Sequence, residues 1–124
     1  MIKLSYEELL EIHDYVLNEH GGLSGVLNED LLKSSIETAF TTMYGEDLYK
    51  TDEEKISITI YCLIKNHGFR DANKRTAILV FHILLDDCDI ELDATEEDYI
   101  CLAINIAQHY NKNDITQWIN NHRI

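Results

Sequence analysis

Hydrophobic residues recur every three to four positions along most of the chain, which predicts a series of amphipathic helices. The first predicted helix begins at Ser5, where Glu8 completes a capping box, and it ends at the Gly21-Gly22 pair. The same kind of capping signal predicts further helix starts at Asn28, Thr51 (with Glu54), Thr95 (with Asp98), and Asn113 or Asp114.

One further segment, Thr76–Leu85, is almost wholly apolar. A helix that is apolar on most sides is buried, so this segment predicts a central helix. Residues 41–50 show little periodicity and contain Gly45, which predicts a loop or a short extended flap. The chain is therefore predicted to be all-α: a compact bundle of about six helices with a buried central helix, forming one domain over residues 1–124.

The composition is that of a cytosolic protein. The N-terminal residues lack an apolar signal segment, and no run of about 18 apolar residues is present, so we expect a cytoplasmic location and no membrane partner. Three cysteines without CxxC spacing argue against a disulfide framework, and Cys62 and Cys101 are expected to be small core residues. A net charge of −13 argues against direct binding to nucleic acid.

The positive charge is nevertheless concentrated in one place. Four of the 10 Lys and Arg residues lie within eleven positions, at Lys65, Arg70, Lys74 and Arg75. A basic island in an acidic protein indicates a small anionic ligand such as a nucleotide phosphate. The alternative is that these cations pair with neighbouring acids on a solvated face, and charge alone does not separate the two interpretations.

The second half of this stretch, Asn73, Lys74 and Arg75, falls in the first turn of the predicted central helix. Cations there oppose the positive end of the helix dipole unless an anion occupies the site. A phosphate would be held by backbone N–H groups, the dipole and both cations together. The alternative is a misplaced helix boundary that puts both cations deeper in the helix, on its wet side.

The first half of the stretch carries acid–base and metal-binding groups. His67 follows the preceding helix and is either a favourable C-terminal cap or a general base. Asp71 is either a Mg²⁺ ligand acting with substrate phosphates or the N-cap of the central helix. Phe69 between them is expected to pin the loop into the core. Together these residues predict a site for phosphoryl or nucleotidyl transfer, without the GxxxxGK[ST] or GxGxxG loops of the familiar nucleotide folds.

Residues 67–76 read HGFRDANKRT and resemble the signature of the Fic/Doc family, in the HxFx[DN]xNKR form of its Doc branch. The larger Fic branch reads HPFx[DE]GNGRxxR instead. Residues 21–32 and 44–49 are also similar to Doc sequences, so the resemblance covers nearly the whole chain. It implies a compact helical Fic core, as found in Doc toxins of bacterial type II toxin–antitoxin modules.

The resemblance also implies a role for each matching position. His67 matches the catalytic histidine that activates the acceptor hydroxyl, and Asp71 matches the carboxylate associated with Mg²⁺. The positions implied to bind the nucleotide are Asn73, Lys74, Arg75, Ala72 and, more loosely, Lys65.

Lys74 decides which activity the resemblance implies. Most Fic proteins have glycine at this position and transfer AMP, whereas Doc has a lysine that fills the space beside the backbone and adds a charge. The nucleotide is then bound in reverse and the γ-phosphate of ATP is transferred. The implied protein is a kinase that uses ATP and Mg²⁺, phosphorylates a threonine of elongation factor Tu and arrests translation. The alternatives are a Fic-type AMP transferase and a catalytically degenerate Fic module that only binds a partner.

Three departures from the wider family qualify this picture. Gly68 replaces the usual proline, which is expected to loosen the loop, and Ala72 replaces the usual glycine. Ile78 and Leu79 occupy the region of the second motif arginine, which weakens the case for AMP transfer. The self-inhibitory [ST]xxxE[GN] motif fits poorly at residues 42–46, so inhibition is expected from a separate antitoxin.

Overall fold

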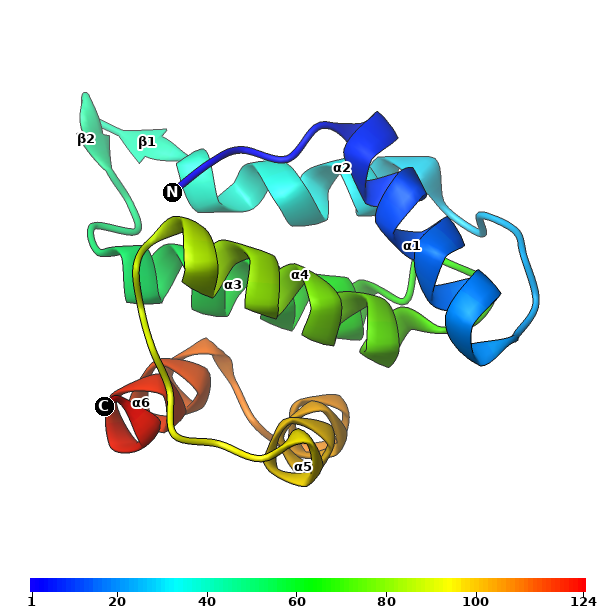
Figure 1. The fold of residues 1–124 in the computed structure, drawn as a ribbon. Helices are drawn as coiled ribbons and strands as arrows, with labels where there is room; N and C mark the ends of the chain where they lie inside the picture. The colour runs from blue at the N-terminus through cyan, green and yellow to red at the C-terminus, as the bar shows by residue number, and fades with distance from the viewer.

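The computed structural model describes residues 1–124 and contains six α-helices, a 3-10 turn and a two-stranded hairpin (Figure 1). In chain order the elements are α1 Tyr6–His20, α2 Glu29–Glu37, η1 Thr38–Phe40, β1 Thr42–Met43, β2 Glu46–Asp47, α3 Asp52–Asn66, α4 Asn73–Asp87, α5 Glu96–Gln108 and α6 Lys112–His122. The predicted all-α bundle of about six helices is confirmed.

Local capping chemistry starts most helices where the sequence predicts. Ser5 and Glu8 form the expected capping box of α1, and Thr95 and Asp98 form that of α5. The backbone of Gly21 has a φ of 77°, a left-handed conformation that glycine adopts without strain, and α1 ends there. These starts and stops were predictable because each cap involves residues no more than a few positions apart.

The prediction for the start of α6 was wrong. The N-cap is Asn111, whose side-chain oxygen accepts hydrogen bonds from the N–H groups of Asn113 and Asp114. The Asp114 carboxylate in turn accepts from the N–H of Asn111, which completes a capping box that Asn113 or Asp114 could not form alone. The box predicted at Thr51 is only half formed, because Glu54 accepts from the N–H of Lys50 instead.

The two central helices, α3 and α4, pack against each other in the middle of the molecule (Figure 1). α1 and α2 lie on one side of this pair, and α5 and α6 lie on the other. The burial predicted for α4 is confirmed, and α3 is equally central, since it contacts α2, α4, α5 and α6. The largest fully buried side chains of the core include Phe69, Phe81, Leu9, Leu32, Ile56, Ile60, Leu84, Ile106, Ile115 and Ile119.

Residues 41–50 form the expected extended flap, a small hairpin in which Thr42 pairs with Asp47. The expectation for Cys101 was wrong: it lies exposed on the outer face of α5, where its neighbours on the buried face, Leu102 and Ala103, take the core positions. Cys62 is partly buried, and this burial raises the pKa of its thiol. None of the helices has the length and hydropathy needed to cross a lipid bilayer.

Candidate functional site

The loop between α3 and α4, residues 67–72, begins and ends with a left-handed residue. His67 has φ 49° and ψ 51° where α3 ends, and Ala72 has φ 64° where α4 begins. Non-glycine residues adopt this conformation only where the surrounding structure holds them in it. Two such residues in one short loop therefore indicate that specific contacts determine its shape.

Asn73 supplies the first of these contacts. Its side-chain oxygen accepts the N–H of Phe69 at 3.0 Å, and its side-chain nitrogen donates to the carbonyl of Phe69 at 2.9 Å. The Phe69 ring is 1% exposed and lies in the core, which confirms that this residue pins the loop. The side chain of Asn73 is thus committed to the loop, and this residue can serve an anion through its backbone N–H.

A second set of contacts ties the loop to residues 21–28. The N–H of Arg70 donates to the carbonyl of Gly25 at 2.9 Å, and the Gly68 carbonyl accepts from the N–H of Leu27 at 2.8 Å. A Cβ at position 68 would lie 2.5 Å from Cδ2 of Leu32, so glycine permits close packing here. The expectation that Gly68 loosens the loop was therefore wrong.

The Asp71 carboxylate faces the α1–α2 connection. Its Oδ2 accepts the N–H of Leu23 at 3.0 Å, and its Oδ1 accepts the N–H of Ala72 at 2.8 Å. These two backbone donors lower the pKa of the Asp71 carboxyl below its ordinary value and keep it ionised. A Cβ at Gly22, which has φ 125°, would lie 2.9 Å from Oδ2, so this glycine makes room for the carboxylate.

Asp71 is not the N-cap of α4, which corrects that alternative. The N-cap is Ala72, and no side chain caps the helix. The backbone N–H groups of Asn73, Lys74 and Arg75 therefore have no hydrogen-bond partner. These groups form the positive end of the helix dipole and are free to bind an anion.

Lys74 and Arg75 lie in the first turn of α4 with exposed side chains, as predicted, so the alternative of a misplaced boundary was wrong. The interpretation in which ion pairs neutralise them was also wrong, because the five ion pairs of the structure involve neither residue. Two unpaired cations beside three free N–H groups make this end of α4 strongly attractive to a phosphate.

A cavity of about 390 Å³ lies at this helix end. It is lined by His20, Gly21, Gly22, His67, Asp71, Ala72, Asn73, Lys74 and Arg75. The structure thus brings together every proposed site residue except Lys65, whose ammonium donates to the carbonyl of Ala107 at 3.1 Å instead. His20, Gly21 and Gly22 at the end of α1 also line the cavity, and they were not predicted as site residues. In the sequence the glycine pair indicates only that the helix ends there.

The cavity offers one carboxylate to a metal. No group of three or more His, Cys, Asp or Glu side chains is arranged to hold an ion by itself. Asp71 remains ionised and borders the cavity next to the start of α4. This donor set fits Mg²⁺, which is commonly bound by one or two carboxylates together with substrate phosphates and water.

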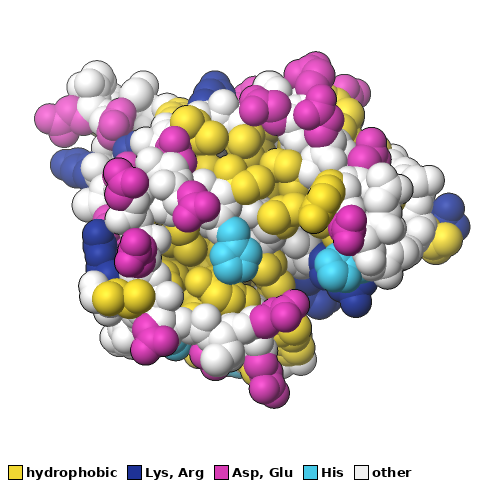
Figure 2. All heavy atoms as spheres, in the orientation of Figure 1, with side chains coloured by type: hydrophobic (Ala, Val, Ile, Leu, Met, Phe, Trp, Pro, Cys, Tyr) yellow, Lys and Arg dark blue, Asp and Glu magenta, His cyan; other side chains and the backbone are white.

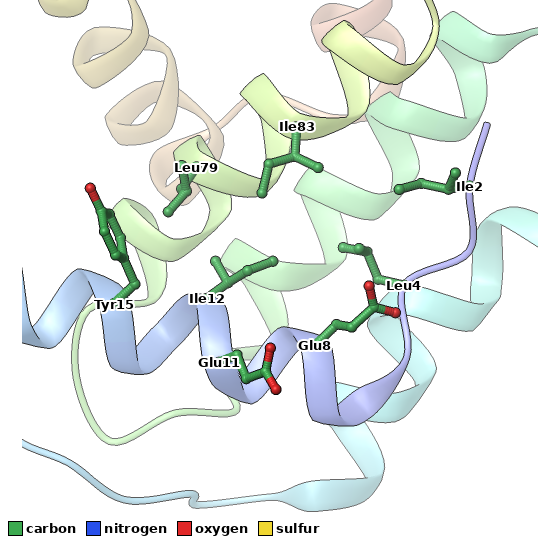
Figure 3. Close-up of a pocket in the computed structure, with 8 residues that line it drawn as sticks. All are labelled: Ile2, Leu4, Glu8, Glu11, Ile12, Tyr15, Leu79 and Ile83. Carbon is green, nitrogen blue, oxygen red and sulfur yellow. The ribbon is translucent and has the colours of Figure 1, made fainter.

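A separate, apolar groove of about 360 Å³ runs between α1 and α4. Figure 3 shows Ile12 and Tyr15 of α1 opposite Leu79 and Ile83 of α4. Glu8 and Glu11 also line the groove, and Figure 2 shows exposed hydrophobic side chains framed by acidic ones on this face. This acid-rimmed apolar groove and the polar pocket have no lining residue in common.

The polar pocket defines the class of site: an uncapped helix start suited to an anion, with a histidine and a carboxylate beside it. Residues 3–85 match the sequence profile of the Fic/DOC family, and this chain belongs to that family. It is 33% identical over 79 residues to the "Protein kinase doc" of Escherichia phage P1. That match covers 63% of this chain and 61% of the phage protein, so the chain aligns with about three fifths of its relative.

Proposed function

We propose that this protein is a Doc-like toxin that transfers the γ-phosphate of ATP to a serine or threonine hydroxyl of a translation factor. Elongation factor Tu is the first candidate, because it is the target that the family resemblance implies. The observation that carries the proposal is the uncapped start of α4, where three free N–H groups and two unpaired cations face a pocket that also contains His67 and Asp71. The name of the phage relative, a protein kinase, supports the same reaction class.

In this proposal His67 is the general base. Its side chain is exposed at the entrance of the loop, where an acceptor hydroxyl can reach it. The imidazole takes the hydroxyl proton as the oxygen attacks the γ-phosphorus, the bond from that phosphorus to the bridging oxygen breaks, and ADP leaves. The N–H groups of α4, with Lys74 and Arg75, stabilise the negative charge of the transferring group.

Asp71 would hold Mg²⁺, which when bound neutralises charge on the nucleotide phosphates. The backbone hydrogen bonds from Leu23 and Ala72 fix the carboxylate at the edge of the pocket and keep it ionised. Ala72 forms the wall between this carboxylate and the helix start. We leave Lys65 outside the proposed site, because its ammonium is bound to α5.

Lys74 favours γ-phosphoryl transfer over AMP transfer. Its side chain occupies the start of α4, where a glycine would let a phosphate approach the backbone closely. The intact set of His67, Asp71 and Arg75 favours an enzyme over a degenerate binding module, because a module that only binds has no need of a base beside a phosphate site.

We propose that a cognate antitoxin restrains this activity by binding the groove of Figure 3. An exposed apolar groove between two helices suits an amphipathic helix from a partner. Glu8 and Glu11 in the groove lining favour a partner segment that carries Lys or Arg beside its apolar face. The replacement Ile12→Asp should weaken antitoxin binding while leaving transfer by the isolated protein unchanged.

The test is to incubate the purified protein and Mg²⁺ with elongation factor Tu, and separately with a bacterial extract, using ATP labelled on the γ- or the α-phosphate. We expect label from the γ-phosphate only, its loss with His67→Ala, and its retention with His109→Ala, a matched change at an exposed histidine outside the pocket. Label from the α-phosphate only would establish AMP transfer instead. No transfer to any protein would favour the binding module.

A further inference from the structure

His13, on α1, is the one histidine buried in the core, with 3% of its surface exposed. Its imidazole lies flat against the ring of Phe69, with a centroid distance of 3.7 Å and an interplanar angle of 1°. The same imidazole contacts a second residue of the loop between α3 and α4, because its Nε2 lies 2.9 Å from the carbonyl oxygen of Asp71. A carbonyl can only accept, so Nε2 carries a hydrogen and donates it.

This hydrogen bond holds the peptide that joins Asp71 to Ala72, and this peptide also orients the Asp71 carboxylate. The carbonyl of Asp71 and the N–H of Ala72 belong to one planar peptide, and in a trans peptide they point in opposite directions. The carbonyl is held by His13, and the N–H donates to Oδ1 of the Asp71 carboxylate at 2.8 Å. Fixing the carbonyl therefore fixes the direction of the N–H that orients the carboxylate.

The same peptide leads directly into the first turn of α4. Ala72 is left-handed at φ 64°, and α4 begins at the next residue with its free N–H groups. A strained conformation of this kind persists only when neighbouring contacts hold it. The Asp71 carboxylate has a second donor, because the N–H of Leu23 donates to its Oδ2. The Asp71 carbonyl, in contrast, accepts a hydrogen bond from His13 alone.

We propose that His13 is a positioning residue, which uses its Nε2–H to fix the Asp71–Ala72 peptide and so aligns the Asp71 carboxylate and the start of α4 with the pocket. This proposal rests on the proposed function for its kinetic consequence. The competing explanation is that His13 only fills space against Phe69. The two explanations differ because packing needs the ring alone, whereas positioning needs the donor.

Two variants separate the donor from the ring. His13→Phe keeps a flat ring against Phe69 and removes the donor. His13→Gln removes the ring but places an amide N–H at about the reach of Nε2. If His13 positions the site, the phenylalanine variant should stay folded and lose transfer activity, and the glutamine variant should be less stable and retain it.

The first readout does not depend on activity. In the full-length wild-type protein, a long-range ¹H–¹⁵N NMR spectrum should show His13 protonated at Nε2. The amide proton of Ala72 should move upfield in His13→Phe, as its bond to the carboxylate loosens, and stay near its wild-type position in His13→Gln. A neutral wild-type imidazole protonated at Nδ1, or an unmoved Ala72 amide in His13→Phe, would overturn the proposal. If the phenylalanine variant does not fold, His13→Gln decides, because its Ala72 amide should stay near the wild-type position if the donor holds the peptide and should move if the ring does.

The second readout is kinetic. His13→Phe should lower kcat about tenfold to a hundredfold, the usual range for a residue that orients a ligand. Its KM for the protein substrate should stay within about threefold of wild type, because that substrate does not touch the buried ring. Unchanged kcat in His13→Phe together with a loss in His13→Gln would show that the ring matters and the donor does not. If the wild-type protein transfers nothing, the proposed function fails, and the NMR comparison still tests His13.

Discussion

Replacing Asn73 with alanine should destabilise the protein far more than the loss of so small a side chain suggests. The side chain of Asn73 makes hydrogen bonds of 3.0 and 2.9 Å to both backbone groups of Phe69, and all three groups are buried. No other hydrogen bond reaches the N–H or the carbonyl of Phe69. Asn73→Ala therefore leaves a donor and an acceptor unpaired in the interior.

The magnitude follows from the two orphaned groups. Each buried polar group that loses its partner costs about 1 to 3 kcal/mol, which gives about 2 to 6 kcal/mol for the pair. A domain of this size has a total free energy of unfolding of about 5 to 15 kcal/mol, so the loss is a large fraction of it. Asn73→Asp keeps the acceptor for the N–H of Phe69 but turns the donor into a carboxylate oxygen that faces the Phe69 carbonyl, so this variant should also be strongly destabilised.

Urea unfolding followed by circular dichroism measures these differences through the midpoint and the slope of the transition. The matched control is Asn120→Ala, an exposed position near the end of α6, which should change the free energy of unfolding by less than about 0.5 kcal/mol. If Asn73→Ala were no more destabilising than this control, the idea that Asn73 holds the loop between α3 and α4 would be refuted.

Three further changes test other contacts of the site. Gly68→Ala should lower the free energy of unfolding by about 1 to 3 kcal/mol in urea denaturation, because its Cβ would overlap Leu32. Gly68 does not have the positive φ that strains a side chain at Gly45, so the loss measures the overlap, and an unchanged urea midpoint would contradict it. Thr76→Val should raise stability by about 1 kcal/mol, because the Thr76 hydroxyl is buried without a partner; a lower melting temperature would contradict this. Asp71 has a lowered pKa in the folded state, so its ionised form stabilises the fold above its ordinary pKa and this stabilisation is lost as the pH falls. As the pH is lowered, the free energy of unfolding of Asp71→Asn should thus fall less steeply than that of wild type. Equal slopes would show that Asp71 is not held as described.

The sequence predicts those parts of the fold that depend on neighbouring residues. Ser5 with Glu8, Asn28, and Thr95 with Asp98 cap helices within three positions, so their roles can be read from spacing. The start of α6 was predicted wrongly although it also depends on neighbouring residues, because Asn111 forms a capping box with Asp114 that neither Asn113 nor Asp114 could form as the N-cap.

The candidate site was predictable as a set of residues, but its internal contacts were not. The cations at the start of α4 and the buried Phe69 follow from local pattern. The fit of Gly68 against Leu32 depends on how α2 packs over the loop, and the bond from His13 to Asp71 joins positions 58 residues apart. Lys65 shows the converse, since a cation close to the motif in sequence points toward α5 in the fold.

The central claim is that this pocket transfers a terminal phosphate. Intact-mass spectrometry of elongation factor Tu, after incubation with ATP, Mg²⁺ and the purified protein, tests it most directly. If the pocket transfers the γ-phosphate, the mass should increase by one phosphoryl group, and this increase should be absent with His67→Ala and unchanged with His109→Ala. An increase of one AMP group would contradict the role of Lys74, and no increase on elongation factor Tu or any protein of a bacterial extract would contradict the assignment of an enzyme.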